Sequence, residues 1–330
     1  RCDCFILGSD QLHYPALYRD FDEFSDLEYI FSNKKKIAMA SSTGRDQFNG
    51  SEYQRLRLSH ALQRFDSISV REKAAVQTYH DQFGVECTWV LDPVFLCSRK
   101  YYDELADKAA PICCKPYIAA YVLDLSAEKL CFLQNLAENK QLSLYLILDA
   151  ANQAVTGLTI PYDRITVVHA PSNETWIRAI RDCTFFITDS FHGSCFALIF
   201  QKQLLAFANE RRGMERFKTL FGLLGIENRL LSQPSDISAM QDMDYMEICS
   251  KLEPEILRSQ QWLRSALIKP HKAPLSEADL VRSDVGKSLC KVNQQLTNID
   301  KSEANIWERI ALLDQRFGSL EQRNVLGDQR

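Results

Sequence analysis

Short apolar runs and amphipathic helical stretches alternate along the first two thirds of the chain. The first series of β-rich runs lies at 4–7, 36–41, 67–70 and 88–91, with helical spacing of apolar residues at 51–64 and 72–82. The second series lies at 117–122, 143–148, 165–169, 184–188 and 204–208, with helical segments near 127–139, 173–182 and 193–200. Strands that alternate with helices predict βα units and mainly parallel sheets. The pattern therefore predicts an α/β protein with two domains.

A loop around 109–116, which contains two prolines, separates the two series. We expect an N-terminal Rossmann-like domain over 1–110 and a C-terminal Rossmann-like domain with a closing helix over 111–268. Residue 1 is Arg and a strand follows almost at once, so we expect the first elements of the N-terminal domain to be missing. Ligands of open α/β sheets bind beyond the carboxyl ends of the strands, which makes the cleft between the domains the expected site.

The C-terminal part of the chain has a different pattern. It turns helical from about 236, and two prolines at 269–274 predict a linker. Beyond the linker, apolar residues recur every seven positions, at Val285, Val292, Ile299, Ile306, Leu313 and Leu320. This spacing predicts either a coiled coil that self-associates or binds a partner, or a long helix folded back on its own body. We assign 269–330 to a linker and a coiled-coil-like helical tail.

Composition argues against several classes of protein, among them nucleic-acid-binding, disulfide-rich and membrane-spanning proteins. The formal net charge of the 330 residues is −4, which argues against non-specific nucleic-acid binding. The eleven cysteines contain no C-x-x-C pair and are expected to be reduced thiols of an intracellular protein. No apolar run approaches the ~18 residues of a membrane span, and no signal peptide is visible. We expect a soluble cytoplasmic protein, with peripheral contact to the inner face of the membrane left open.

The clearest candidate site lies in the segment 187–200. An apolar strand run ends just before Ser190, a helix-capping type, so His192 is placed at a strand-to-helix turn. The first N–H groups of a helix lack intrahelical partners and attract anions. Gly193 and Ser194 are small enough for a ligand to approach the backbone closely. A histidine there is suited to moving protons on a phosphate- or carboxylate-bearing substrate.

Arginines follow two other strand ends. Arg71 comes directly after the strand run at 67–70, where it can clamp a carboxylate or phosphate or pair with a neighbouring carboxylate on the surface. Arg212 and Arg216 lie beyond the last strand run, where an anion site and a solvated helix face both fit the pattern. No cluster has the spacing of metal ligands, so no metal site is expected.

Polar residues also follow the strand runs of the first series. Asp10 and Gln11 offer a carboxylate and an amide near the expected cleft, although turn and helix capping would explain them as well. Asp92 precedes a proline at another strand end, and we interpret it as a structural residue.

Several of these motifs occur together, in one order, in a known family. They are GSDQ at 8–11, ISVREK at 68–73, WVLDP at 89–93, ITDSFHGSCFALIF at 187–200 and N-x-x-RG-x-x-RF at 209–217. In these motifs the chain resembles the polysaccharide pyruvyl transferase family over about 1–235. The resemblance implies a fold like that of two-domain glycosyltransferases of the B type. It also implies a transferase that moves the enolpyruvyl unit of phosphoenolpyruvate to sugar hydroxyls, leaving a pyruvate ketal on a cell-surface polysaccharide or exopolysaccharide precursor.

The resemblance also suggests roles for individual residues. It makes His192 the catalytic acid/base, and it gives the donor site as Arg71, Ser190, Gly193, Ser194, Arg212 and Arg216. The residues expected to bind the acceptor are Asp10, Gln11 and Asn209. The expected partners are phosphoenolpyruvate and a saccharide or lipid-linked oligosaccharide, with no nucleic acid and no cofactor.

Two other functions stay open at this point. The same fold could serve a glycosyltransferase that uses nucleotide sugars. The chain could also be a non-catalytic or bifunctional scaffold in which the repeat at 285–320 recruits another enzyme of glycan assembly.

Overall fold

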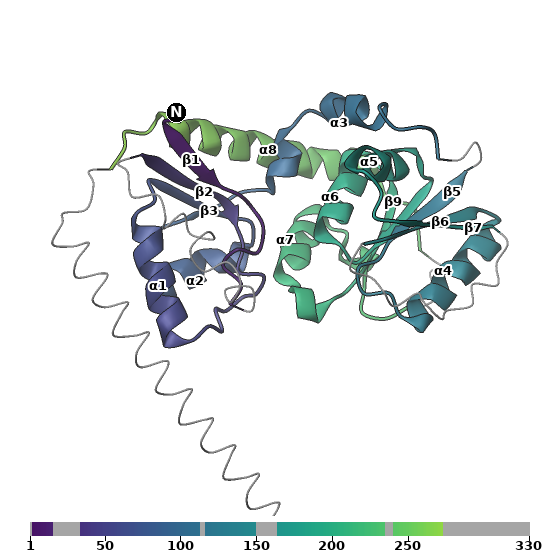
Figure 1. Cartoon of the computed structure of the whole chain (residues 1–330), viewed down its shortest axis with the longest axis horizontal. Coiled ribbons are helices and arrows are strands. Elements are labelled where there is room, and N and C mark those ends of the chain that lie inside the picture. The colour runs from purple at the N-terminus through teal and green to yellow at the C-terminus, as the bar shows by residue number, and fades with distance from the viewer. Residues whose placement is uncertain (1, 16–33, 113–115, 150–163, 235–239, 273–330) are drawn as a thin grey trace, which may run out of the picture.

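Two parallel sheets, each with its own helices, form the body of the protein (Figure 1). The computed structural model describes residues 2–15, 34–112, 116–149, 164–234 and 240–272. The heptad pattern at 285–320 lies outside these residues, so the coiled coil stays a prediction. Both series of expected strands are present, which confirms an α/β fold with two parallel sheets.

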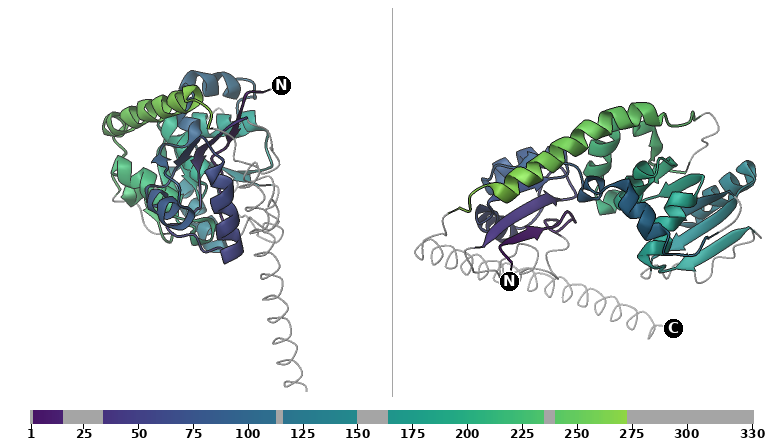
Figure 2. Two further views of the ribbon diagram at one scale, coloured as in Figure 1. Left: turned by 90° about the vertical axis from the view of Figure 1, so that its left-hand side faces the viewer. Right: turned by 90° about the horizontal axis from the view of Figure 1, so that it is seen from above.

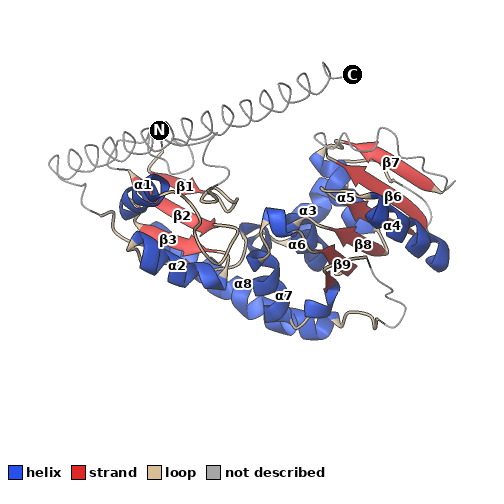
Figure 3. Ribbon diagram, turned by 90° about the horizontal axis from the view of Figure 1, so that it is seen from below, coloured by secondary structure: helices blue, strands red, loops and turns tan. Residues whose placement is uncertain are grey.

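The N-terminal sheet has four parallel strands in the order β1-β2-β3-β4. Their bounds are β1 Cys4–Leu7, β2 Lys35–Ser41, β3 Ser67–Val70 and β4 Thr88–Trp89. Helix α1 covers Glu52–Gln63 and helix α2 covers Lys73–Phe83. Leu58 and Leu62 of α1 share one buried cluster with Tyr79 and Phe83 of α2 and with Val70 of β3. Both helices therefore bury their apolar sides against this sheet (Figure 3).

The C-terminal sheet has six strands in the order β10-β9-β8-β5-β6-β7, and every neighbouring pair is parallel. Their bounds are β5 Tyr117–Tyr121, β6 Ser143–Leu148, β7 Ile165–His169, β8 Phe185–Thr188, β9 Gln203–Phe207 and β10 Leu230–Leu231. Numbered within this domain and read from β7, the order is 3-2-1-4-5-6, that of a Rossmann fold. The strand order reverses between β5 and β8, where such sheets bind ligands.

Helices cover both faces of this second sheet. They are α3 Arg99–Ala106, α4 Ala127–Lys140, α5 Asn173–Asp182, α6 Phe191–Ile199 and α7 Glu215–Leu224. Residues of α3, α5, α6 and α7 share one large apolar cluster, whereas α4 packs into a separate cluster on the other face. The sequence pattern assigned no helix to the residues of α3 or α7, and it predicted the start of α6 near 193. The helix begins at Phe191 because the Ser190 hydroxyl accepts the N–H of Gly193 and so caps it.

Helix α8, Tyr245–Ile268, runs along both domains (Figure 2). Its Leu252 belongs to the large core of the C-terminal domain, whereas Trp262 packs with Met39 and Val90 of the N-terminal domain. The ammonium group of Lys35 donates to main-chain carbonyls at the end of this helix, which lack partners inside it. The helix assigned to the C-terminal domain therefore ends on the N-terminal one.

One buried hydroxyl ties α8 to the loop after β4. The Ser259 Oγ accepts the N–H of Leu91 at 3.0 Å and donates to the Glu255 carbonyl at 2.7 Å. We expect Ser259→Ala to lower the free energy of unfolding by about 1–2 kcal/mol, because it leaves the buried Leu91 N–H without an acceptor. Urea unfolding measures the change, and Ser265→Ala, at an exposed position of the same helix, is the matched control. Equal stabilities of the two variants would contradict this role of Ser259.

Candidate functional site

The two domains meet where β3 and β8 end, and there they bring Arg71 and His192 together. Arg71 follows the last residue of β3, and His192 lies in the first turn of α6. The Nη1 atom of Arg71 is 3.5 Å from Nε2 of His192, although 121 positions separate the two in the chain. The Arg71 side chain is completely buried, whereas that of His192 is 39% exposed. The histidine is therefore the member of the pair that solvent or a substrate can reach.

The turn before α6 is held by its own small residues. The N–H of Ser190 donates to Thr188 Oγ1 at 2.9 Å, and the Ser194 hydroxyl donates to the Ser190 carbonyl at 3.2 Å. A Cβ on Gly193 would lie 2.8 Å from Thr188 Oγ1, closer than side-chain packing allows. Ser190, Gly193 and Ser194 thus shape the turn that presents His192. Their predicted contact with a donor stays a prediction.

Asp92 joins this pair, although the sequence analysis treated it as purely structural. Its Oδ2 accepts from Arg71 Nη1 at 2.9 Å and lies 3.4 Å from His192 Nε2, while Oδ1 accepts the N–H of Val94 at 3.1 Å. Burial would raise the pKa of Asp92, but the hydrogen bond from His192 and the charge of Arg71 outweigh it and hold the pKa well below its usual range. We assign a proton to Nε2 of His192 and direct it to this carboxylate, because an ionised carboxylate can only accept.

Arg216 of α7 lies beside Arg71. The guanidinium carbons of Arg71 and Arg216 are 5.1 and 5.6 Å from the centre of the Phe191 ring. Burial, together with the positive charge of Arg71, lowers the pKa of Arg216 to about 10. That value still leaves the group charged near neutral pH, so two cations share one aromatic ring at the domain boundary.

Several hydrogen-bond donors of these arginines have no acceptor. Among the described residues, Arg71 Nε and Nη2 and Arg216 Nε are buried and make no hydrogen bond. An unpaired buried donor costs about 1–3 kcal/mol, and more when the group is charged. Such groups are rare in folded proteins, where a buried water or an ion completes the bonding of most of them. An anion is the ligand that two guanidinium groups would accept.

Arg212 and Asn209, unlike Arg71 and Arg216, both bind the carboxylate of Asp124. Arg212 donates through Nε and Nη2 to the Asp124 carboxylate at 3.0 and 3.1 Å, and the Asn209 amide donates to the same carboxylate. The hydrogen bond from Arg212, opposed by burial and reinforced by Asn209, lowers the pKa of Asp124 to about 2. Of the three arginines predicted to bind the donor, Arg212 therefore has both ends of its guanidinium on a carboxylate, whereas Arg71 and Arg216 keep unused donors. The predicted ligand contacts of Arg212 and Asn209 stay predictions.

The loops after β1 and β2 reach across to the loop after β9. Gln11 Nε2 donates to the Arg212 carbonyl at 2.8 Å, while Asp10 is exposed nearby and its charge acts on Arg216. Gly213 has a φ of +84°, and a Cβ on it would lie 2.0 Å from the carbonyl oxygen of Gly44. The two domains are therefore in direct backbone contact at this edge of the site.

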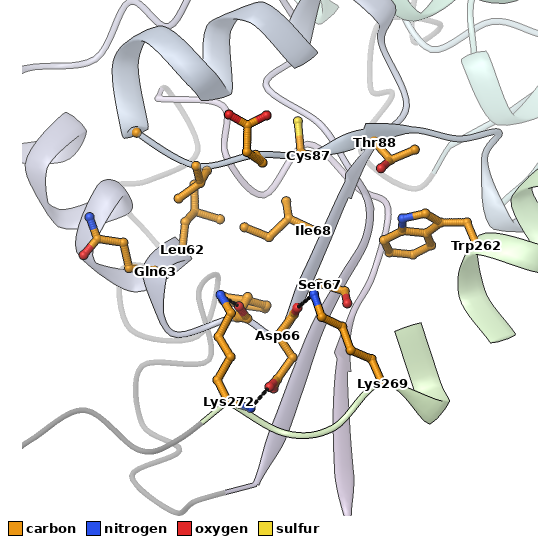
Figure 4. A pocket seen from close by; sticks show the side chains of 14 residues that line it. Leu62, Gln63, Asp66, Ser67, Ile68, Cys87, Thr88, Trp262, Lys269 and Lys272 are labelled. Carbon is orange, nitrogen blue, oxygen red and sulfur yellow. Dashed lines mark hydrogen bonds between the residues drawn. The ribbon is translucent and has the colours of Figure 1, made fainter. Parts of the chain in front are cut away.

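A separate pocket of about 590 Å³ lies at the amino ends of β3 and β4 (Figure 4). The ammonium groups of Lys269 and Lys272 border it and donate to the carbonyls of Asp66 and Phe65 at 3.2 and 2.6 Å. Since Arg71 follows the carboxyl end of β3, this pocket and the candidate site lie at opposite ends of the sheet. The described residues contain no group of three or more side chains suited to hold a metal, and no described helix could cross a membrane.

Gly213 offers a direct test of the contact between the domains. We expect Gly213→Ala to prevent the observed approach of the two loops, because the added methyl group would overlap the Gly44 carbonyl and the backbone conformation disfavours a side chain. Small-angle scattering should then give a larger radius of gyration than for the unsubstituted protein. Gly222→Ala is the control, because its Cβ would meet only ordinary contacts. Identical scattering of all three proteins would rule out a closing role for Gly213.

The Asp92 carboxylate should make stability depend on pH. We expect Asp92→Asn to lower the free energy of unfolding at neutral pH by about 3–5 kcal/mol, because Arg71 loses its closest buried counter-charge. The pKa of Asp92 is lowered on folding, so its contribution is complete above the unfolded value of about 3.9 and is lost as the pH falls below it. The difference between the two proteins should therefore shrink in acid.

Urea unfolding at a series of pH values measures this difference. Asp107→Asn is the matched control, because its carboxylate is 65% exposed and pairs with Arg181 at the surface, where an ion pair contributes little. A difference between wild type and Asp92→Asn that stayed constant from neutral pH into acid would contradict an ionised, stabilising Asp92.

Comparison with known proteins now identifies the family. The profile of the family described as polysaccharide pyruvyl transferase matches residues 1–211. A search of curated proteins found no significant match. Among solved structures, UDP-N-acetylglucosamine 2-epimerase from Rickettsia bellii is similar, with 15% identity, a TM-score of 0.48 and coverage of 80% of this chain and 72% of that one. UDP-GlcNAc 2-epimerase from Neisseria meningitidis, bound to UDP-GlcNAc, is also similar, with 11% identity and a TM-score of 0.47. The match covers 86% of this chain and 76% of that one.

The family profile covers more than half of the chain, and the matched part includes both sides of the site that holds Arg71 and His192. The chain belongs to the polysaccharide pyruvyl transferase family and is a transferase.

Proposed function

We propose that this protein transfers the enolpyruvyl unit of phosphoenolpyruvate to hydroxyl groups of a saccharide, forming a pyruvate ketal on a polysaccharide or its precursor. The observation that carries the proposal is the pair of buried arginines, Arg71 and Arg216, with unused donors beside a reachable histidine. Phosphoenolpyruvate bears a carboxylate and a phosphate, and two guanidinium groups suit such a ligand. The proposal includes a domain arrangement like that of B-type glycosyltransferases, with the donor in the cleft.

The arginines and the start of α6 would hold the donor. Arg71 and Arg216 are fixed by burial and by contact with the Phe191 ring, so little reorganisation is needed when charge develops on the phosphate. The N-terminus of α6 adds partial positive charge at the same place. Departure of the phosphate is favoured because these groups stabilise the charge that develops on it as the bond breaks.

His192 would carry the protons. Formation of a ketal requires a proton on the methylene carbon of the enolpyruvyl unit, which leaves an oxocarbenium-like centre on the adjacent carbon. An acceptor hydroxyl adds to that centre and loses its proton, phosphate departs, and a second hydroxyl closes the ring. With Nε2 held by Asp92, the Nδ1 atom of His192 is the nitrogen left to give and take these protons.

The acceptor would bind from the side of the loop that holds Asp10 and Gln11, which borders the same cleft. We propose a saccharide or a lipid-linked oligosaccharide as acceptor. The eight described cysteines are free thiols, which supports a reducing, cytoplasmic setting for the enzyme.

Substitution of His192 tests the proposed chemistry. We expect His192→Ala to reduce the release of phosphate from phosphoenolpyruvate, measured with a glycan acceptor, by about 100- to 1000-fold, because the proton carrier is lost. His80→Ala is the matched control, since that histidine lies exposed on α2. A His192→Ala protein with the full rate would refute the role of His192. The absence of any acceptor-dependent phosphate release from the unsubstituted protein would refute the proposed function.

A further inference from the structure

A second carboxylate, Glu72, lies in the same buried cluster without an evident task in the proposed chemistry. Its side chain is completely buried, and Oε1 accepts from the Ser42 hydroxyl and lies 3.6 Å from Arg71 Nε. Its Oε2 is buried and makes no hydrogen bond. Glu72 is also the N-cap residue of α2, yet its side chain does not cap that helix. The carboxyl group is directed into the arginine cluster instead of the position that its place in the chain would favour.

The groups that face Glu72 come from three elements. Arg71 adjoins it on the β3 side, Ser42 approaches from the loop after β2, and Arg216 acts on it from α7 across the cleft. Burial raises the pKa of Glu72 above its ordinary value, and the charge of Arg71, the hydrogen bond from Ser42 and the charge of Arg216 oppose this only in part. Asp10 acts on the same Arg216 from the loop after β1.

Asp92 and His192 lie on the other side of Arg71 from Glu72. The cluster therefore contains two guanidinium groups, of Arg71 and Arg216, and two carboxyl groups, of Glu72 and Asp92. A donor with a carboxylate and a phosphate would upset this balance. Its negative charges would sit beside Glu72 and Asp92 in a region of low dielectric, where like charges repel strongly.

The two carboxylates differ in how easily they can be neutralised. Asp92 accepts from Arg71 and from the Val94 N–H and contacts His192, so protonation would break several bonds. Glu72 has one free oxygen, and a proton on it removes an unpaired buried charge. Glu72 is therefore the group that protonates at the smaller cost.

We propose that Glu72 takes up a proton when phosphoenolpyruvate binds, which frees Arg71 and Arg216 to direct their charge at the donor. This inference rests on the proposed function, because it assumes that donor. The Ser42 hydroxyl and the N-terminus of α2 favour the ionised form while the site is empty. Binding linked to proton uptake weakens as the pH rises, so Glu72 makes donor affinity depend on pH.

Calorimetric titration of the full chain with phosphoenolpyruvate tests the proposal. The titration is run in two buffers with different heats of ionisation, at several pH values between about 6 and 8. We expect the unsubstituted protein to take up more protons on binding than Glu72→Gln, which has no group there to titrate. We also expect Glu72→Gln to bind phosphoenolpyruvate about tenfold more tightly at the highest pH, with a lower KM and an unchanged kcat.

Two further variants separate Glu72 from its neighbours. Glu104→Gln, at an exposed position of α3, should leave proton uptake as in the unsubstituted protein. His192→Gln removes the neighbouring imidazole, and the uptake due to Glu72 should persist in it. If Glu72→Gln does not fold, Ser42→Ala takes its place. Loss of the Ser42 donor should move the proton uptake to higher pH.

The outcomes distinguish this inference from the proposed function. Equal proton uptake by the unsubstituted protein and Glu72→Gln, or unaltered uptake in Ser42→Ala, overturns the role of Glu72 and leaves the donor assignment standing. Failure of phosphoenolpyruvate to bind the unsubstituted protein overturns both. Binding with an uptake that disappears in Glu72→Gln and persists in His192→Gln supports both.

Discussion

The buried ion pair between Arg71 and Asp92 is the interaction on which the site depends. Both side chains are removed from solvent, and their closest atoms are 2.9 Å apart. A buried pair of this kind loses hydration that its mutual attraction only partly restores, so it contributes little to stability when compared with an apolar pair. Its value lies in position, because Arg71 and Asp92 together hold His192 at the boundary of the domains.

The topology explains why charged groups can be assembled there. In a parallel sheet all strands end at the same edge, so Arg71 after β3 and Asp92 beyond β4 become neighbours without any local sequence signal. The second sheet supplies His192 from the helix that follows β8, beside the strand-order reversal between β5 and β8. The two sheets thus assemble a charged cluster at the domain boundary, where the His192 side chain is 39% exposed.

Sequence patterns predicted the strands well because each buried strand needs a run of apolar residues. They also predicted that Arg71 and His192 belong to a site, since both follow such runs. The pattern did not identify Asp92 as a site residue, because turn formation alone explains an aspartate before a proline. The structure confirms that turn role, since Asp92 accepts the N–H of Val94. The sequence pattern could not predict the pairing of Arg212 with Asp124, because 88 positions separate the two and only the fold brings them together.

The same geometry determines how a ligand could enter. Helix α8 packs continuously on both domains, through Leu252 at one end and Trp262 at the other. On the side away from α8, the domains are joined by the Gln11 side chain on the Arg212 carbonyl and by the backbone approach at Gly213. Regions with few buried apolar contacts open at the lowest free energy. We therefore expect this side to open before the α8 side does, which would separate the loops that border the arginine cluster while α8 keeps the domains together.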